Sequence, residues 1–381
     1  MDLTYTEEEE AFRARLRDWL AGALAKLPPK PSPGDWPGRR AYDAGWQRAL
    51  YDAGYADLHW DASPTQRLIF LEETERAGAP YVGANFVGLL HAGPTIAAEG
   101  TPEQRERWLP PILRGEEIWC QGFSEPDAGS DLAALRTRAV RDGDDYVVTG
   151  SKIWTSHAEV ADWCELLVRT DPRAPRHRGI SWLAMPMDAP GVTVRPLRTL
   201  AGSAEFAEVF LDEVRVPVRN RVGDENDGWR VTMVTLSFER GTAFVGEVVA
   251  CRRVLAELAR AARRSGRWDD PALRRRLGRL HAEFGALWRL TQWNVSEAQR
   301  SPGGVPGVGG SVFKLRYSHA RQELYDAAAE VLGARALVLD GEGGPWVADR
   351  LSSLSYTIAA GTSQIQRNIV AERILGLPKG G

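Results

Sequence analysis

Three short stretches of this chain place hydroxyls, carboxylates, glycines and one indole ring where they could bind a flat, electron-rich ligand. They are residues 123–131 (FSEPDAGSD), 150–156 (GSKIWTS) and 361–368 (GTSQIQRN). The last begins with Gly-Thr-Ser, a typical helix start, and N–H groups at a helix N-terminus can hold a phosphate or a polar ring edge. Each stretch taken alone is also compatible with an ordinary turn or strand end, because turn chemistry is common.

In this order and at this spacing, the three stretches resemble the acyl-CoA dehydrogenase family of flavoproteins, over nearly the whole chain. The resemblance implies an FAD cofactor and α,β-dehydrogenation of an acyl-CoA thioester. It also implies that ring and substrate contacts come from matching positions. For the flavin these positions are Phe123, Ser124, Gly129, Ser130, Trp154, Ser156, Thr362 and Gln364. For the acyl-CoA they are Ser130, Arg240 and Ala360.

The expected reaction needs a carboxylate that removes the α-proton, and such a base works best in a dry pocket. Ala360 stands where many family members carry this glutamate. Its backbone N–H, which in the family binds the thioester carbonyl, is retained. Members of the isovaleryl and long-chain types carry the base on the helix that opens the C-terminal bundle, directly before an arginine. Glu239, followed by Arg240, matches that position, so we expect Glu239 to be the base; the alternative is a solvated Glu-Arg pair.

The chain departs from the family where a neighbouring subunit usually holds the adenine half of FAD. Glu330 replaces a glutamine, Ala334 replaces a glycine, and Arg267 is followed by Trp268 in place of a Phe-Gly pattern. A carboxylate beside a pyrophosphate would repel it. Two interpretations stay open. The chain forms a heterotetramer with a paralogous chain, or it is a homo-oligomer that uses other basic residues. The candidates for that second case, which also fit a solvated helix face, are Arg263, Arg264, Arg274, Arg275, Arg276 and Arg279.

Composition excludes several other classes of function. A net charge of −3, from 48 basic and 51 acidic residues, gives no drive toward nucleic acid or anionic membranes. No apolar run reaches the roughly 20 residues that span a bilayer, and the acidic N-terminus lacks the layout of a signal peptide. Three scattered cysteines favour free thiols in a reducing cytoplasm, and the six histidines show no metal-ligand spacing. We therefore expect a cytoplasmic protein with no metal site.

The pattern of elements predicts an α+β multidomain fold. An N-terminal α-helical domain (1–118) shows capping signals at Thr6 and Thr101. A middle antiparallel β-domain (119–228) contains a hairpin turn at 142–145 and short strands over 164–169, 180–185, 192–195 and 208–216. A C-terminal four-helix bundle (229–381) is interrupted by a glycine-rich loop at 301–310.

The expected function is a dehydrogenase that passes electrons to an electron-transferring flavoprotein. One alternative is an oxidase or flavin oxygenase of the same fold, distinguished by a fast reaction of its reduced flavin with oxygen. Another is a non-catalytic partner subunit, which would not need Glu239, Trp154, Ser156 and Thr362. Acyl length is not predicted, since one methylene in an apolar pocket changes binding by only about 1–3 kcal/mol.

Overall fold

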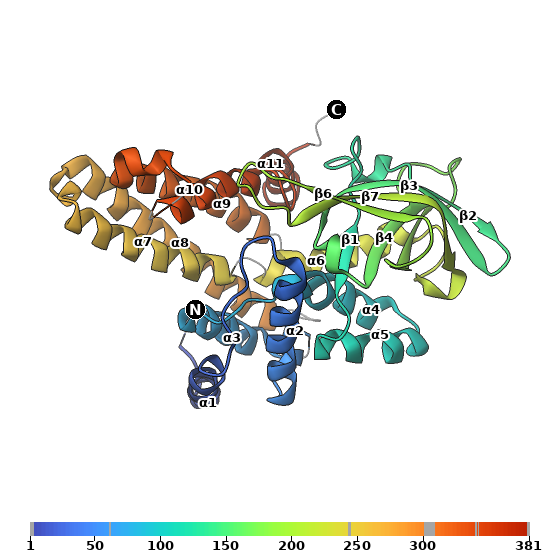
Figure 1. Ribbon diagram of the computed structural model, residues 1–381, viewed down its shortest axis with the longest axis horizontal. Coiled ribbons are helices and arrows are strands. Elements are labelled where there is room, and N and C mark those ends of the chain that lie inside the picture. Colours follow the sequence, from blue (N-terminus) through green and yellow to red (C-terminus); the bar gives the residue numbers. More distant parts are fainter. Residues whose placement is uncertain are drawn as a thin grey trace.

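The computed structural model describes residues 4–60, 62–242, 245–300, 309–339, 341 and 343–378. Figure 1 shows a helical bundle at one end and a twisted β-sheet at the other, with the N-terminal helices packed below them. Helix α6 (Gly228–Thr242) runs between the two ends. This arrangement is the helix, sheet and helix order that the sequence predicts.

The N-terminal helices begin where their capping residues predict. Thr6 and Glu9 form a reciprocal capping box, and Thr101 with Gln104 forms another directly before Pro102. The apolar face expected of the first helix is buried at Phe12, Leu16 and Leu20. The helices are α1 (Glu7–Leu24), α2 (Trp36–Asp52), α3 (Pro64–Ala77), α4 (Gly93–Glu99) and α5 (Pro102–Arg114), with short turns η1 (Ala56–His59), η2 (Gly83–Asn85) and η3 (Gly88–Ala92).

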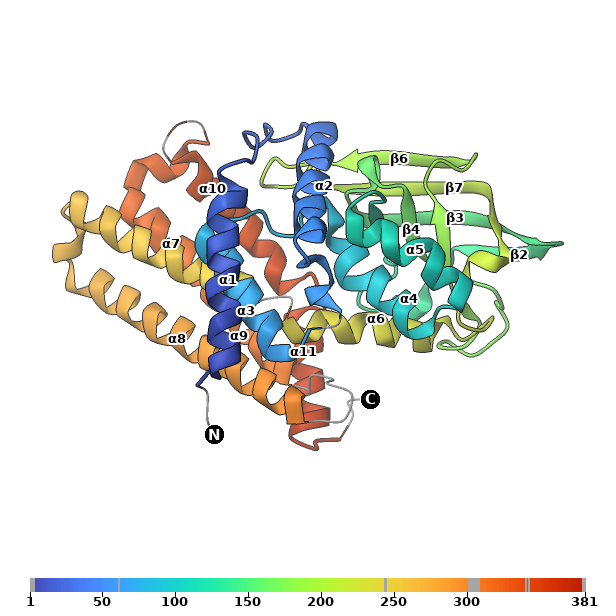
Figure 2. The same cartoon turned by 90° about the horizontal axis from the view of Figure 1, so that it is seen from below.

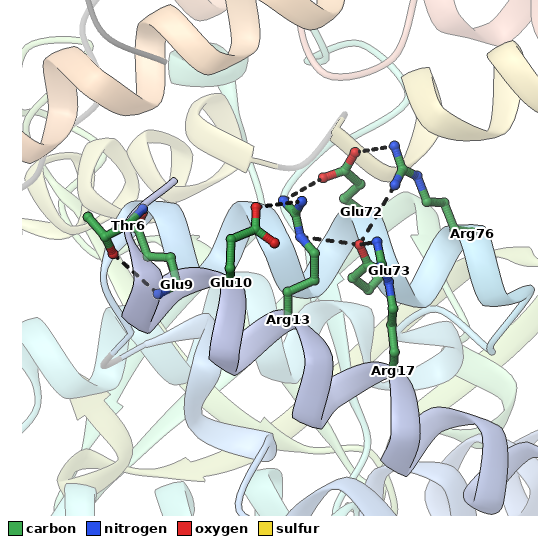
Figure 3. Close-up of polar contacts among 8 residues, drawn as sticks. All are labelled: Thr6, Glu9, Glu10, Arg13, Arg17, Glu72, Glu73 and Arg76. Carbon is green, nitrogen blue, oxygen red and sulfur yellow. Dashed lines mark hydrogen bonds and ion pairs between the residues drawn. The ribbon is translucent and has the colours of Figure 1, made fainter. Parts of the chain in front are cut away.

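Two adjacent buried glutamates on α3 join that helix to α1 (Figure 3). Arg17 Nε lies 2.5 Å from Glu73 Oε2, and Arg13 Nη2 lies 3.3 Å from Glu72 Oε2. Arg76, one turn farther along α3, pairs with Glu72 at 2.5 Å. The three arginines compensate two carboxylates that would otherwise repel each other in a low-dielectric site.

The middle domain is one eight-stranded sheet with the order β6-β7-β3-β2-β4-β5-β8, and β1 pairs with β4. The turn at 142–145 joins β2 and β3, and all four predicted strands are present with slightly wider bounds. Most pairs are antiparallel as predicted, but β1 and β2 each pair with β4 in parallel. The strands are β1 (Trp119–Gly122), β2 (Arg138–Asp142), β3 (Asp145–Ser156), β4 (Trp163–Arg169), β5 (Ile180–Pro186), β6 (Val192–Leu197), β7 (Phe206–Pro217) and β8 (Arg221–Val222), with short turns η4 (Leu132–Ala134), η5 (Ala158–Val160) and η6 (Val218–Asn220).

The C-terminal part is built on three long helices and a shorter fourth (Figure 2). Helix α9 packs against α7, α8, α10 and α11, so it occupies the centre of the bundle. Residues 301–308 of the predicted glycine-rich loop lie outside the described part of the chain. The helices are α7 (Val245–Arg264), α8 (Pro271–Arg300), α9 (Gly309–Leu332), α10 (Gly344–Ser353) and α11 (Ser363–Ile369), with short elements η7 (Arg267–Asp269), η9 (Gly333–Leu337), η10 (Leu354–Thr357) and η11 (Val370–Ile374).

Four tryptophans join the N-terminal helices to the sheet. Trp108 of α5 meets Trp119 edge-on at 5.9 Å, and Trp119 stacks on Trp163 at 5.7 Å and on Trp182 at 6.5 Å between ring centroids. These rings belong to an apolar core shared by helices and strands. Across the described residues, no helix combines the length and apolar character that a membrane crossing requires.

Candidate active site

The first two sequence stretches meet directly in the fold. The backbone N–H of Ile153 donates to the carbonyl oxygen of Ser124 at 2.9 Å. Beside this bond, Lys152 Nζ donates to the carbonyl oxygen of Phe123 at 3.2 Å and to Glu125 Oε1 at 2.8 Å. The loop that starts at Phe123 is therefore attached to β3 by one backbone bond and one ammonium group.

Lys152 and Glu125 form a buried ion pair, with the lysine 0% and the glutamate 8% exposed. Glu125 also accepts hydrogen bonds from the backbone N–H groups of Arg136 (2.7 Å) and Thr137 (2.8 Å). Burial alone would raise the pKa of Glu125, but Lys152 and these bonds outweigh it and lower that pKa. Burial likewise lowers the pKa of Lys152, opposed by the charge of Glu125.

The sequence stretches contain both members of this pair, but the sequence does not predict that they are partners. Opposite charges in two neighbouring motifs are the only signal for it, and such charges are usually solvated. A hollow of about 410 Å³ lies beside the pair and is lined from both stretches, by Glu125, Pro126, Asp127, Ala128, Ala134, Arg136, Thr137, Gly150, Ser151 and Phe210.

Trp154 is turned outward by an irregularity of β3. The β3–β7 register shifts between Lys152 and Thr155, and Trp154 has a φ of 60°. Trp154 is 58% exposed, and its indole and the ring of Phe206 meet in an edge-to-face arrangement with the centroids 6.0 Å apart. A bulky residue with left-handed backbone is costly and marks functional sites, and bulges re-aim side chains next to such sites.

The C-terminal stretch forms a second strained turn. Ala360 has a φ of 52° and Gly361 a φ of 80°. Thr362 then caps α11, its hydroxyl accepting the N–H of Ile365 at 3.1 Å, as the Gly-Thr-Ser pattern predicts. Gln366, which is buried, donates from Nε2 to the carbonyl oxygen of Ala360 at 3.0 Å. The left-handed turn is thus held from inside by the helix that it opens.

Helix α9 contacts both α6 and α11, and so connects the helix that carries Glu239 with the Ala360 turn. Glu239 and Arg240 lie in the last turn of α6, and their side chains lie outside the described part of the structure.

The predicted flavin-site residues differ in exposure. Gln364, Gly129 and Ser130 are exposed, and Ser124, Ser156 and Thr362 are partly exposed, while the side chain of Phe123 is buried in the core. Within the described residues, no hydrogen bond or ion pair joins the Ala360–Gln364 turn to the 123–156 pair of stretches.

His157 follows the flavin-site candidates on β3 and also has left-handed backbone, with a φ of 58°. Its ring packs on Trp36 of α2 at 5.5 Å between centroids, and its backbone N–H donates to the carbonyl oxygen of Glu205 at 2.8 Å. Burial, assisted by the nearby charge of Arg39, lowers the pKa of His157 to about 4. The ring is therefore neutral in the folded protein at ordinary pH.

Replacing His157 by asparagine should reduce the loss of stability in mild acid. An unfolded histidine takes up a proton near pH 6.5, whereas the folded one resists until about pH 4. Its contribution is complete above pH 6.5 and is lost as the pH falls from 6.5 to 4. Urea unfolding at pH 7 and pH 5 should show the wild type losing about 1–2 kcal/mol more than His157→Asn over this interval. Asparagine tolerates left-handed backbone, so equal losses in both proteins would contradict the assigned pKa.

The structure alters the expectation for Glu330. Its carboxylate lies 3.2 Å from Arg276 Nη1, and its carbonyl oxygen accepts from Arg267 Nη2 at 3.3 Å. The charge expected to repel a pyrophosphate is thus partly compensated. Of the remaining basic run, Arg279 pairs with Glu323 at 2.7 Å, and Arg263 lies over the ring of Trp268 at 4.0 Å.

The residues present fit a flavin ring. Such a ring needs an apolar wall on one face and hydrogen-bonding groups at its polar edge. The outward-turned indole of Trp154, a residue that is 58% exposed, supplies an apolar surface beside the ring of Phe206. Hydroxyls of Ser124 and Ser156 are partly exposed on the two stretches that Lys152 holds together.

Comparison with known proteins gives a consistent result over the whole chain. Three domain models of acyl-CoA dehydrogenases match: the N-terminal domain over residues 6–116, the middle domain over 120–214 and the C-terminal domain over 226–375. The acyl-CoA dehydrogenase IpdE1 of Mycobacterium tuberculosis is 40% identical over 390 residues, covering 98% of this chain and 99% of the relative. IpdE1 of Mycolicibacterium smegmatis is 39% identical over 401 residues, covering 98% of each.

Two solved structures are also similar in sequence. One chain of the ChsE4-ChsE5 complex from Mycobacterium tuberculosis matches with a TM-score of 0.81 at 33% identity, covering 100% of both chains. One chain of the steroid ACAD Tcur3481-Tcur3483 matches with a TM-score of 0.84 at 30% identity, again covering 100% of both. With all three domains matched and relatives at 40% identity along its full length, this chain belongs to the acyl-CoA dehydrogenase family of flavin-dependent oxidoreductases.

Proposed function

We propose that the chain catalyses the FAD-dependent α,β-dehydrogenation of a CoA thioester, with Glu239 as the catalytic base. The observation that carries this proposal is the backbone of Ala360. Gln366 holds Ala360 in its left-handed conformation, although the methyl side chain of Ala360 cannot accept a proton. A turn kept in a costly conformation without its usual carboxylate retains the backbone role alone, and the base then comes from α6.

Each residue has a separate task in this proposal. Glu239 removes the α-proton of the acyl group, and Arg240 with Ser130 helps to hold the CoA thioester. The N–H of Ala360 donates to the thioester carbonyl oxygen, where negative charge develops. Trp154 and Ser156 cover one side of the ring, while Phe123, Ser124, Gly129, Thr362 and Gln364 supply further contacts. FAD held by these residues would supply the acceptor for the β-hydrogen and its electron pair, and an electron-transferring flavoprotein in the cytoplasm would take up the electrons.

The preferred assembly is a heterotetramer with a paralogous chain. Glu330 and Ala334 replace the residues with which family members bind a neighbour's FAD, and Leu337, Val338 and Leu339 directly after them are 86%, 51% and 61% exposed. A contiguous group of exposed apolar residues is typical of a surface that contacts another protein. ChsE4-ChsE5 and Tcur3481-Tcur3483, each named as a pair of proteins, support this choice over a homo-oligomer.

The proposed substrate is a CoA thioester of a bulky, steroid-derived acid. Support comes from the name of the steroid ACAD at 30% identity. It also comes from the base on α6 in place of residue 360, a position compatible with bulky acyl groups. A straight-chain fatty acyl-CoA is the competing substrate.

The deciding experiment measures flavin per polypeptide and mass for the chain purified alone and co-expressed with a paralogue encoded nearby. Little flavin in the chain purified alone, together with about one flavin per pair of chains in a heterotetramer, would support the proposal. A full complement of flavin in a homo-oligomer would overturn the proposed assembly.

The flavin-containing form is then mixed anaerobically with steroid-side-chain and straight-chain acyl-CoA. Bleaching by the first, and slow reoxidation by oxygen, would support a dehydrogenase. Fast reoxidation would indicate an oxidase, and no bleaching by any thioester would refute the activity.

A further inference from the structure

Helix α9 holds the segment that precedes the Ala360 turn through three side chains spaced one helical turn apart. Gln322 Nε2 donates to the carbonyl oxygen of Ser353 at 3.2 Å, and Ser318 Oγ donates to that of Tyr356 at 2.8 Å. Lys314 Nζ donates to the carbonyl oxygen of Gly361 at 2.6 Å. Residues at i, i+4 and i+8 share one helix face, so this face of α9 is directed along the segment that ends in the turn.

The bond made by Lys314 is at the most strained point of this segment. Ala360 and Gly361 are consecutive residues with positive φ, and the conformation is unfavourable for alanine. Their two carbonyl oxygens accept from different side chains, Gln366 for Ala360 and Lys314 for Gly361. Each bond opposes relaxation of the turn to an ordinary right-handed conformation, which would redirect the N–H of Ala360.

The choice of a lysine is informative because its side chain is only 3% exposed. A buried ammonium group has three N–H donors, so it can hold the Gly361 carbonyl and make other contacts at the same time. A fixed positive charge near the turn has a further effect, since it stabilises negative charge developing on a thioester oxygen bound there. Hydrogen bonding to a peptide carbonyl also polarises that peptide's N–H, which here belongs to Thr362.

We propose that Lys314 is a positioning residue of the thioester site: its ammonium group fixes the Ala360–Gly361 turn and favours the enolate-like charge formed there. This inference rests on the proposed acyl-CoA dehydrogenation. It concerns a residue that none of the three sequence stretches contains. Lys314 acts through the backbone of the turn and need not touch the substrate.

The test compares three substitutions that separate the donor from the charge. Lys314→Arg keeps both, Lys314→Gln keeps a neutral donor, and Lys314→Met removes both. Lys30→Met, at an exposed lysine of the N-terminal part, is the matched control. The first readout is amide hydrogen exchange of residues 357–366 in the flavin-free chain. We expect at least about tenfold faster exchange in Lys314→Met, confined to this segment, and wild-type exchange in the control.

The second readout is anaerobic flavin bleaching of the loaded enzyme at saturating acyl-CoA. Misplacement of reacting groups by about 1 Å can cost 10²-fold in rate, so we expect kcat to fall about a hundredfold in Lys314→Met. Flavin content and KM should change by less than about threefold, because Lys314 acts on the transition state and not on the binding of the flavin or the substrate. Lys314→Arg should recover most of the rate, and Lys314→Gln should not.

Wild-type exchange and kcat in Lys314→Met would overturn the proposal, as would exchange that rises uniformly along the chain. If Lys314→Met does not fold, the comparison of Lys314→Gln with Lys314→Arg decides, and equal rates overturn the role of the charge. If no thioester bleaches the wild-type flavin, the proposed activity fails on its own. The exchange measurement still shows whether Lys314 holds the turn.

Discussion

Replacing Glu239 by glutamine is expected to slow the bleaching of bound flavin by a cognate acyl-CoA by about 10²–10⁴-fold. The amide has nearly the shape of the carboxylate but cannot accept the α-proton. Because residue 360 is an alanine, the family's other base position offers no second carboxylate to replace the lost function. The measurement is stopped-flow absorbance of the oxidised flavin under anaerobic conditions, with flavin content determined for each preparation.

The matched control is Glu257→Gln on α7, at a glutamate whose side chain is 41% exposed and pairs with Arg253 at 3.2 Å. It should bleach at the wild-type rate, since solvated pairs on helices contribute little. A decrease of less than about tenfold in Glu239→Gln would refute its role as the base, because it falls below the usual effect of a general base. Introducing a carboxylate at the other position, in the double variant Glu239→Gln and Ala360→Glu, should restore part of the rate.

Replacing Lys152 by methionine is expected to destabilise the protein by about 3–5 kcal/mol and to remove most of its flavin. The substitution leaves Glu125 buried and charged without its ammonium partner. It also removes the donor to the carbonyl oxygen of Phe123, which holds the first flavin-site stretch against β3. Urea unfolding of the flavin-free chain gives the stability, and absorbance of the flavin-containing assembly at equal protein concentration gives the bound flavin.

Lys26→Met, at an exposed lysine, serves as the control and should leave both values near those of the wild type. The double variant Lys152→Met and Glu125→Gln removes both charges and should be more stable than Lys152→Met alone, by about 1–3 kcal/mol. Additive losses in the double variant would show that the pair is not coupled. Full flavin content in Lys152→Met would contradict its proposed part in holding the loop.

Most secondary structure was predictable because its signals are local. The capping boxes at Thr6 and Thr101 involve residues three apart, and the β2–β3 hairpin is specified by four turn residues. The parallel pairing of β1 with β4 was not predictable in this way. It joins Trp119–Gly122 to Trp163–Leu166, more than forty residues along the chain, and alternation of side chains does not specify the direction of a partner strand. The domain boundaries, the flavin contacts and Glu239 remain predictions, and the experiments above test flavin binding and the role of Glu239.

By itself, the sequence determined the family and the order of helices and strands, and it predicted which residues would face a flavin, since these depend on motifs and short-range patterns. Only the tertiary structure decided how those residues are held. It showed the bulge that turns Trp154 outward, and the burial of Lys152 against Glu125. It also showed the charge of Arg276 beside Glu330, and the bond from Lys314 to Gly361. Each of the last three joins segments at least 27 residues apart, and the bulge is a register shift between β3 and β7. The free energy of such contacts depends on burial and distance that arise only when the chain is folded.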